Sequence, residues 1–471
     1  MKKIGNHTWL IIIVFVISRI ILRFFDIHFQ YDILLKYWQY LDVATLKHNL
    51  LKGVWYDHAQ PPFFNLFLGT VLKIAGSHAD YVFAILFKLI TLVNCLLLYG
   101  LVKKLTGHAK LALILSLLFL LSPASLILEN ELFYTTFISM LFLISCHFLV
   151  GFNEGIDWKK ALGFFLPLAI ICLTRSMYHL YWLLLILVIA LIYCRKNTGF
   201  SKLVVAGMLS LLLVGSWYVK NYFIFGKFSA STWIGMNLAR NVFHDDPITD
   251  SSRIEAFEPF SRVSMYYPFI SKTYEKKYAG LNDLDLLPEY KNLPYSDTLL
   301  NMNNIDYIEV SDKYLEVSKK RILSHPVNYL KNVLQSSVIF FAPATRYPSI
   351  EKEAKKISYY DVIYSFNVSH FAKGFYQRRV ALTISAIPKI LIYFFVFFSL
   401  ARNVIRTRQI SLLNLFIITT IAYVFVVSSF VEHYENMRFR FEVEPMFILL
   451  LGQIIYHFLN KKKTSGQPSQ K

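Results

Sequence analysis

The chain has 471 residues, of which 55% are hydrophobic and 17% are charged. Because an ordinary soluble domain carries roughly 25% charged residues, this composition excludes a water-soluble fold. The formal charge of +19 does not indicate nucleic acid, since the basic residues stand in short clusters beside apolar segments, as the positive-inside rule and anionic headgroups require. The composition therefore predicts an integral membrane protein with no nucleic-acid partner.

Apolar segments recur along most of the chain, and many approach the roughly 20 residues that a membrane-spanning helix needs. They predict an all-α polytopic membrane protein with about ten transmembrane helices. The predicted spans are residues 9–25, 81–101, 111–128, 132–151, 161–174, 178–194, 202–224, 380–401, 410–431 and 441–459.

A shorter apolar stretch, residues 63–75, decides the sidedness of everything that follows it. If residues 1–3 are cytoplasmic and this stretch is re-entrant or interfacial, five successive basic clusters fall on the cytoplasmic side. If the stretch crossed, several of these clusters would lie outside, so we predict that it does not cross. The clusters are Lys103-Lys104 with Lys110, Lys159-Lys160, Arg195-Lys196 with Lys202, Arg402 to Arg408, and Lys461 to Lys463.

This topology divides the chain into four parts. Residues 1–226 form an N-terminal transmembrane module, which includes a first outer loop with re-entrant or juxtamembrane helices. A mixed outer-face region follows, and His325 opens an amphipathic stretch in it that we place at the membrane interface. We expect a multi-pass protein of the inner, cytoplasmic membrane with its active site on the periplasmic side. The remaining boundaries are 26–60 for the first outer loop, 227–379 for the outer-face region, 380–460 for the C-terminal transmembrane helices and 461–471 for a cytoplasmic tail.

The first outer loop contains four aspartates and ends in a rigid Pro61-Pro62 pair. Carboxylates held beside a membrane surface can act as general bases, and proline fixes the backbone next to them. For each aspartate alone a solvated loop charge is the commoner explanation, and two prolines can equally begin a helix. The loop as a whole is a candidate site. Its members are Asp26, Asp32, Asp42 and Asp57, followed by His58-Ala59-Gln60.

Two acids, Glu129 and Glu131, stand at the outer end of the third predicted span, shortly before Tyr134. Ionisable groups at membrane depth are costly and by default indicate function, although a tight interfacial turn explains these two equally well. Arg175 is a lone cation at another outer boundary. It suits a phosphate but can also extend to lipid headgroups.

Two further strings place charge at outer span ends. Lys220-Asn221-Tyr222 closes the seventh predicted span, and Glu432 to Pro445 precedes the last one. In the second string, alternating Arg and Glu can pair with one another. Guanidinium groups also suit a membrane-proximal phosphate, so we predict anion binding by Arg438 or Arg440.

Taken together, these strings resemble the GT-C superfamily of membrane glycosyltransferases, in particular the bacterial relatives of protein O-mannosyltransferases and of the aminoarabinose transferase acting on lipid A (glycosyltransferase family 39-like). The resemblance covers most of the membrane-embedded chain, whereas residues 227–379 find no counterpart. It rests on the acidic first loop ending in His58-Ala59-Gln60-Pro61-Pro62, on Pro123 with Glu131, on Lys220-Asn221-Tyr222 with Phe225-Gly226, and on Arg438-Phe439-Arg440 with Glu444-Pro445.

The resemblance implies transfer of a sugar from a polyprenyl phosphate donor to a glycan, lipid or protein acceptor on the outer face, within membrane lipid. It also implies a catalytic carboxylate in the first outer loop. By distance ahead of His58, Asp32 fits that place best, Asp42 second and Asp26 third. The Asp-Glu pair often seen in the family is Asp32-Ile33 here, and Glu131 would take the place of the second family acid.

In the resulting hypothesis, Asp32 or Asp42 accepts the proton of the acceptor hydroxyl while cations stabilise the departing lipid phosphate. His58, Glu131 and Asp57 offer ligand atoms for a divalent metal ion, but their spacing matches no metal-binding motif, and we assign no metal-binding residue. The cations are Arg175, Lys220 and Arg438 or Arg440, and the further substrate-binding residues are His58, Gln60, Tyr134 and Asn221.

Two other classes of function remain open. A transporter or flippase would line a path with charges near the bilayer midplane, whereas here the charges cluster at outer span ends. A non-catalytic scaffold or ligase subunit would use residues 227–379 as its binding element. We therefore place the transferase first and the transporter second.

Overall fold

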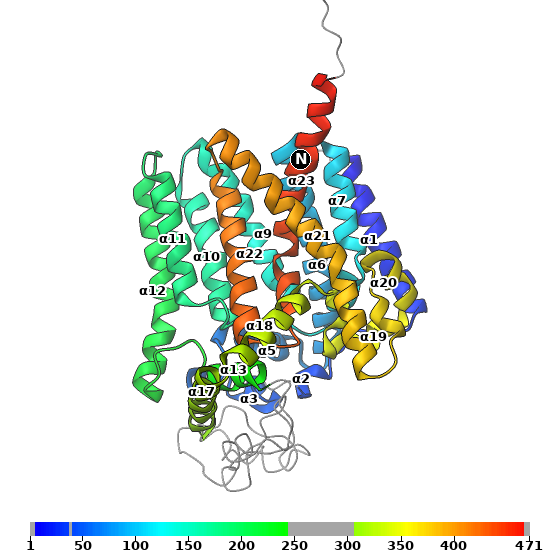
Figure 1. Cartoon of the computed structure of the whole chain (residues 1–471). Coiled ribbons are helices and arrows are strands. Elements are labelled where there is room, and N and C mark those ends of the chain that lie inside the picture. Colours follow the sequence, from blue (N-terminus) through cyan, green and yellow to red (C-terminus); the bar gives the residue numbers. More distant parts are fainter. Residues whose placement is uncertain (1–4, 37–39, 244–305, 466–471) are drawn as a thin grey trace, which may run out of the picture.

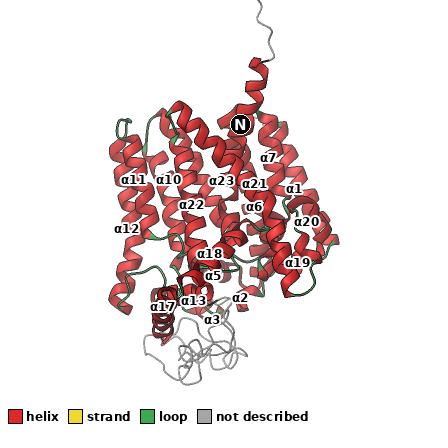
Figure 2. Ribbon diagram, in the orientation of Figure 1, coloured by secondary structure: helices red, strands yellow, loops and turns green. Residues whose placement is uncertain are grey.

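The computed structural model describes residues 5–36, 40–243 and 306–465 (Figures 1 and 2). Within these ranges the chain forms helices joined by turns, and its only strand-like pairing is an isolated bridge between Gln30 and Glu131. The prediction of an all-α membrane protein is confirmed for this part of the chain.

Seven helical segments in the described ranges are long and apolar enough to cross a membrane. The expected count of about ten is not confirmed, because three predicted spans correspond to helices of only 13 to 17 residues. The long segments are α1 (Asn6–Phe24), α5 (Pro62–Ala75) with α6 (Ala79–Thr106), α9 (Thr135–Val150) with η2 (Gly151–Glu154), α12 (Phe200–Phe225), α21 (Phe375–Thr407), α22 (Leu412–Val431) and α23 (Asn436–Ser465). The shorter ones are α7 (Ala109–Leu121), α10 (Trp158–Thr174) and α11 (Leu180–Cys194).

The predicted span 111–128 is interrupted. Helix α7 ends at Leu121, and a separate helix, α8 (Pro123–Leu128), follows it. The Ser122 hydroxyl accepts a hydrogen bond from the Ser125 backbone N–H at 3.1 Å, and Pro123 occupies the first helical position. Both are helix-start signals, so the apolar run contains a new N-terminus that hydropathy alone does not show.

The helices run along a common direction, and the bundle has two different ends (Figure 1). The N-terminus and the ends of α21 and α23 lie at the upper end, while the elements of the first outer loop and the segments on both sides of residues 244–305 lie at the lower end. These lower elements are α2 (Ile33–Lys36), α3 (Val43–His48), α4 (Leu50–Tyr56), α13 (Ile234–Val242) and α17 (Asp306–Ser324).

Helix α5 covers the ambiguous stretch 63–75. It packs against α3 and α4 at the lower end of the bundle. The helix begins at Pro62, whose missing N–H costs nothing at this position. It stops at Gly76, whose φ of +55° favours a residue without a Cβ, and the short η1 (Gly76–His78) leads directly into α6.

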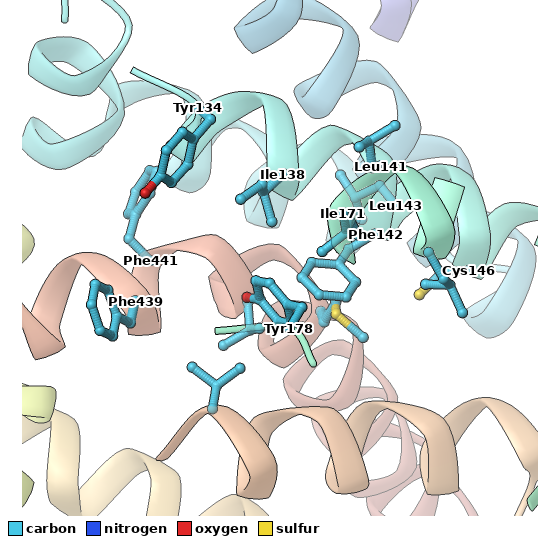
Figure 3. Packing of buried hydrophobic residues seen from close by; sticks show 14 of the residues in the cluster. Tyr134, Ile138, Leu141, Phe142, Leu143, Cys146, Ile171, Tyr178, Phe439 and Phe441 are labelled. Carbon is cyan, nitrogen blue, oxygen red and sulfur yellow. The ribbon is translucent and has the colours of Figure 1, made fainter. Parts of the chain in front are cut away.

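The core of the bundle lies around α9, which packs against both α10 and α23. Figure 3 shows Ile138 and Phe142 of α9 close to Ile171 of α10 and Tyr178. Phe142 and Tyr178 meet edge to face, with their ring centroids 5.4 Å apart. This buried aromatic contact joins the middle of α9 to the turn that follows α10.

The outer region is helical where the structure describes it, whereas a mixed structure was expected. Its helix α18 (Pro326–Phe341) packs against α21, α22 and α23. It begins at the Pro326 that follows His325, as the amphipathic pattern predicts. Between α18 and α21 the described chain forms η4 (Ala344–Arg346), η5 (Pro348–Ile350), α19 (Glu351–Lys356), α20 (Ser358–Ser365) and η6 (Val368–Phe371).

Candidate functional site

The first outer loop meets the turn that carries Glu131. The Gln30 N–H donates to the Asn130 carbonyl at 2.7 Å, within the isolated bridge to Glu131. Further along the loop, the Tyr40 hydroxyl donates to the Leu132 carbonyl at 2.7 Å. Asp32 is exposed and lies just before α2, two residues after Gln30. The fold therefore brings the first-choice loop acid and the second predicted acid into neighbouring segments.

Glu131 is buried, with 1% of its surface exposed. Its Oε2 atom has no hydrogen-bond partner among the described residues. Burial raises the pKa of Glu131 to about 8. The positive charge of Arg438 opposes this rise, and the negative charge of Glu435 adds to it. The raised pKa favours the protonated carboxylic acid, which can donate a hydrogen bond.

Arg438 is the cation whose charge lowers the pKa of Glu131. Its guanidinium pairs with Glu435 three residues earlier and lies 3.9 Å from Glu442 four residues later, so both carboxylates lie on the same helical face. The same group lies over the rings of Phe133, at 4.3 Å, and Tyr347, at 5.0 Å. A fully buried guanidinium is thus compensated by two acids and by aromatic faces.

Arg175 belongs to the same cluster. It caps the end of α10 and forms an ion pair with Glu442, which also accepts a hydrogen bond from the Tyr178 hydroxyl at 2.8 Å. The guanidinium lies 3.7 Å above the Phe439 ring and 5.4 Å from that of Tyr134. We call this set the Glu131 centre. It comprises Tyr40, Glu131, Tyr134, Arg175, Tyr178, Tyr347, Glu435, Arg438 and Glu442.

Arg440 has a different environment from Arg438. Its Nε donates to the Phe340 carbonyl at 2.8 Å and its Nη2 to the Ala342 carbonyl at 3.2 Å, and it pairs with Glu444. Lys389 of α21 reaches the same Glu444 carboxylate at 2.9 Å. Arg440 therefore ties the end of α18 to α21 and α23, and of the two predicted arginines only Arg438 joins the Glu131 centre.

Asp57 organises the end of the first outer loop. Its Oδ1 accepts hydrogen bonds from the backbone N–H groups of Ala59 and Gln60 at 3.0 and 3.1 Å, and its Oδ2 accepts one from Asn65 at 2.9 Å. Lys220 donates to the Asp57 carbonyl at 2.8 Å. Burial raises the pKa of Asp57 to about 7, while the hydrogen bonds and the Lys220 charge hold it from rising further. We call these five residues the Asp57 anchor.

His58 and Asn221 join neighbouring backbone segments. The fully buried His58 ring forms a hydrogen bond with the Thr232 hydroxyl at 2.9 Å and lies against Phe225 at 5.0 Å. The Asn221 amide donates to the Ser229 carbonyl at 2.7 Å. These contacts, together with the Asp57 anchor, attach the first outer loop to the end of α12 and to the segment after it.

Asp42 begins α3. Its two carboxylate oxygens accept hydrogen bonds from the Thr45 N–H at 2.9 Å and the Thr45 hydroxyl at 2.7 Å, which is helix N-capping. For the metal hypothesis, no group of three or more His, Cys, Asp or Glu side chains in the described ranges is arranged to hold an ion, and His58, Asp57 and Glu131 form no such group.

Sequence reasoning did not identify five members of the Glu131 centre as site residues. Glu435 and Glu442 had a usable signal, because they stand three residues before and four residues after Arg438, just before the start of α23 and within it. The other three, Tyr40, Tyr178 and Tyr347, had none, since they are single tyrosines among the 30 in the chain.

No protein-family model, no curated protein and no solved structure matches this chain. The resemblance to the GT-C superfamily therefore stays a prediction from the motif strings.

Proposed function

We propose that the chain is a membrane glycosyltransferase of GT-C type, which moves a sugar from a polyprenyl-phosphate donor to an acceptor hydroxyl at the outer face of the cytoplasmic membrane. The observation that carries this proposal is the bridge between Gln30 and Glu131. It joins the segment that carries the exposed Asp32 to the segment that carries Glu131, a buried acid with one oxygen that has no hydrogen-bond partner among the described residues.

The proposed topology has ten crossings. The three shorter helices α7, α10 and α11 would cross together with the seven long segments, and α5 would remain at the outer end. Two observations support this arrangement. Helix α5 packs on the short helices of the first loop, and the chain ends lie at the opposite end of the bundle (Figure 1). The Glu131 centre would then face the periplasm.

The two acids have different proposed roles. The oxygen of the acceptor hydroxyl attacks the anomeric carbon, the bond from that carbon to the phosphate oxygen breaks, and Asp32 takes the hydroxyl proton. Asp32 is favoured over Asp42 because the Asp42 carboxylate caps α3. Glu131, neutral at pH 7, donates a hydrogen bond to the sugar or to the departing phosphate, whose charge Arg438 stabilises.

The test compares the two loop aspartates. Full-length protein in lipid nanodiscs would be given undecaprenyl-phosphate-linked glucose, mannose, galactose and aminoarabinose with an envelope extract as acceptor, and released undecaprenyl phosphate would be measured. Asp32→Asn is expected to slow release about 100- to 10,000-fold, because loss of a general base costs that much. The matched variant Asp42→Asn should keep transfer and should stay close to wild type in stability, because asparagine caps a helix as well as aspartate does.

Equal activity of Asp32→Asn and wild type would overturn the assignment of the base. If none of the donors is cleaved, and a labelled lipid instead crosses the bilayer of proteoliposomes intact, the transferase proposal fails in favour of a transporter.

A further inference from the structure

A group of charges lies on the opposite side of the turn from the Glu131 centre. Glu129, two residues before Glu131, is fully buried and accepts two hydrogen bonds from Arg19 of α1, at 2.6 and 2.9 Å. The electrostatic fields of Glu129, Arg19 and Arg23 all act on Lys88 of α6. Helix α6, which carries Lys88, packs against α1, which carries both arginines, and we call these four residues the Lys88 cluster.

The charges of this cluster do not balance. Arg19 and Glu129 neutralise each other as a two-point ion pair. Arg23 contacts His28 at 2.7 Å, and His28 in turn reaches Asp26 at 2.6 Å, so a carboxylate lies at the end of that chain. Within the described residues the Lys88 side chain makes neither a hydrogen bond nor an ion pair. One cation is left over.

This cation lies far from the ends of its helix. Lys88 stands nine residues after the first residue of α6, about 14 Å along the helix axis at about 1.5 Å per residue. An ionisable side chain at such depth in a membrane-spanning helix is costly and calls for a partner of opposite charge. The side chain is half-buried, so part of it faces the outside of the bundle.

The surface around Lys88 is apolar and faces outward. Ile85 and Leu89 on α6 are 59% and 47% exposed, and on α1 Ile20 and Phe24 are 55% and 84% exposed. Side chains of this kind at the surface of a membrane bundle contact acyl chains. The missing anion must therefore be attached to an apolar molecule, and in a membrane that molecule is a lipid with a phosphate.

We propose that Lys88, assisted by Arg19 and Arg23, binds the phosphate of a membrane lipid beside the last two turns of α1, where α1 packs against α6. The lipid phosphate supplies the negative charge that the protein lacks there, and the acyl or prenyl chain lies along the exposed faces of α1 and α6. This site does not depend on the transfer reaction, because none of its residues belongs to the Glu131 centre.

The experiment measures lipid retention by native mass spectrometry of the full-length protein in detergent. Two matched pairs of lipids serve as probes: phosphatidylglycerol with diacylglycerol, and undecaprenyl phosphate with undecaprenol. We expect the wild type to retain a phosphate lipid but not the neutral lipid of the same pair. The pair that shows this difference identifies the source as bulk phospholipid or polyprenyl carrier, and a difference in both pairs assigns a general lipid-phosphate site.

The variant Lys88→Gln should reduce retention of the phosphate lipid about tenfold, as expected for loss of a charge-assisted hydrogen bond, while Lys88→Arg should keep it. The control Lys110→Gln removes an exposed cation from the first turn of α7 and should change nothing. Equal retention of phosphate and neutral lipids by the wild type, or equal retention by the wild type and Lys88→Gln, would overturn the proposal. Asp32→Asn should retain the lipid even when it transfers no sugar, so this site and the transferase proposal can fail separately.

Discussion

Asp57 and Glu131 are both buried carboxyl groups at the lower end of the bundle, but they have opposite surroundings. Both Asp57 oxygens accept hydrogen bonds, from the next two backbone N–H groups and from Asn65. One Glu131 oxygen has no partner in the described residues, and the groups around it come from distant parts of the chain. A buried polar atom without a partner requires an explanation, and a ligand is one. Asp57 therefore positions the loop, whereas Glu131 keeps one oxygen without a partner in the described residues, and the proposed mechanism assigns that oxygen to the substrate.

The two regions also use their cations differently. In the Asp57 anchor, Lys220 donates to the backbone carbonyls of Trp55 and Asp57 and so fixes the course of the chain. In the Glu131 centre, Arg175 and Arg438 share the carboxylate of Glu442. The anchor is a set of hydrogen bonds that fixes one loop, while the centre is a network of charges that holds three separate segments together.

Removal of Glu442 should have the largest effect on stability. The variant Glu442→Ala leaves Arg175 without its carboxylate and Arg438 with only Glu435, and breaking a buried ion pair costs about 3–5 kcal/mol. Thermal unfolding of the purified protein in detergent would measure the loss. The matched control Glu316→Ala removes an exposed acid paired with Lys320 at 2.7 Å, and should leave the melting temperature unchanged. Equal melting temperatures for Glu442→Ala and wild type would show that the network contributes nothing to the fold.

Removal of the Asp57 carboxylate should have the next largest effect. The variant Asp57→Ala leaves the N–H groups of Ala59 and Gln60 and the amide of Asn65 without an acceptor, which costs about 1–3 kcal/mol. Thermal unfolding would again report the change. Asp57→Asn, which keeps one acceptor oxygen, should lose less. A large loss of transfer per folded molecule in Asp57→Asn, at unchanged stability, would contradict the division between anchor and site.

The sequence predicts most of the helices because their apolar runs are long and bounded by charge. The predicted span 202–224 corresponds to α12, and 161–174 to α10, within a few residues. Hydropathy does not predict the break between α7 and α8, because the apolar run is continuous there, although Ser122-Pro123 within it is a helix-start signal. Periodicity and hydropathy do not report a capping hydrogen bond, which depends on local backbone geometry.

Site residues can be predicted from the sequence where a charged residue stands at the end of an apolar span. Glu131, Arg175 and Arg438 have that signal, and the structure brings them together. Lys220 has the same signal, but its ammonium donates to backbone carbonyls. The position of a cation in the sequence does not show which partner it will find when it is buried. Tyr347 lies in the outer region without a counterpart, and its approach to Arg438 results from tertiary packing alone.

The variant Glu131→Gln should have the smallest effect on transfer at neutral pH. It is also the most direct test of the proposal that Glu131 donates a hydrogen bond during transfer. A glutamine amide keeps a hydrogen-bond donor, so transfer at pH 7 should stay within about threefold of wild type, a difference below 1 kcal/mol. Glu131→Ala, which removes the donor, should be much slower. Because the pKa of Glu131 is raised to about 8, the wild-type group donates below that pH and loses its proton above it.

The measurement is therefore the rate of undecaprenyl phosphate release between pH 6 and pH 10 for wild type and Glu131→Gln. The account predicts that the wild-type rate falls as the pH rises through about 8 and that the Glu131→Gln rate does not. The same alkaline fall in both proteins, or a Glu131→Gln variant as slow as Glu131→Ala at pH 7, would contradict it.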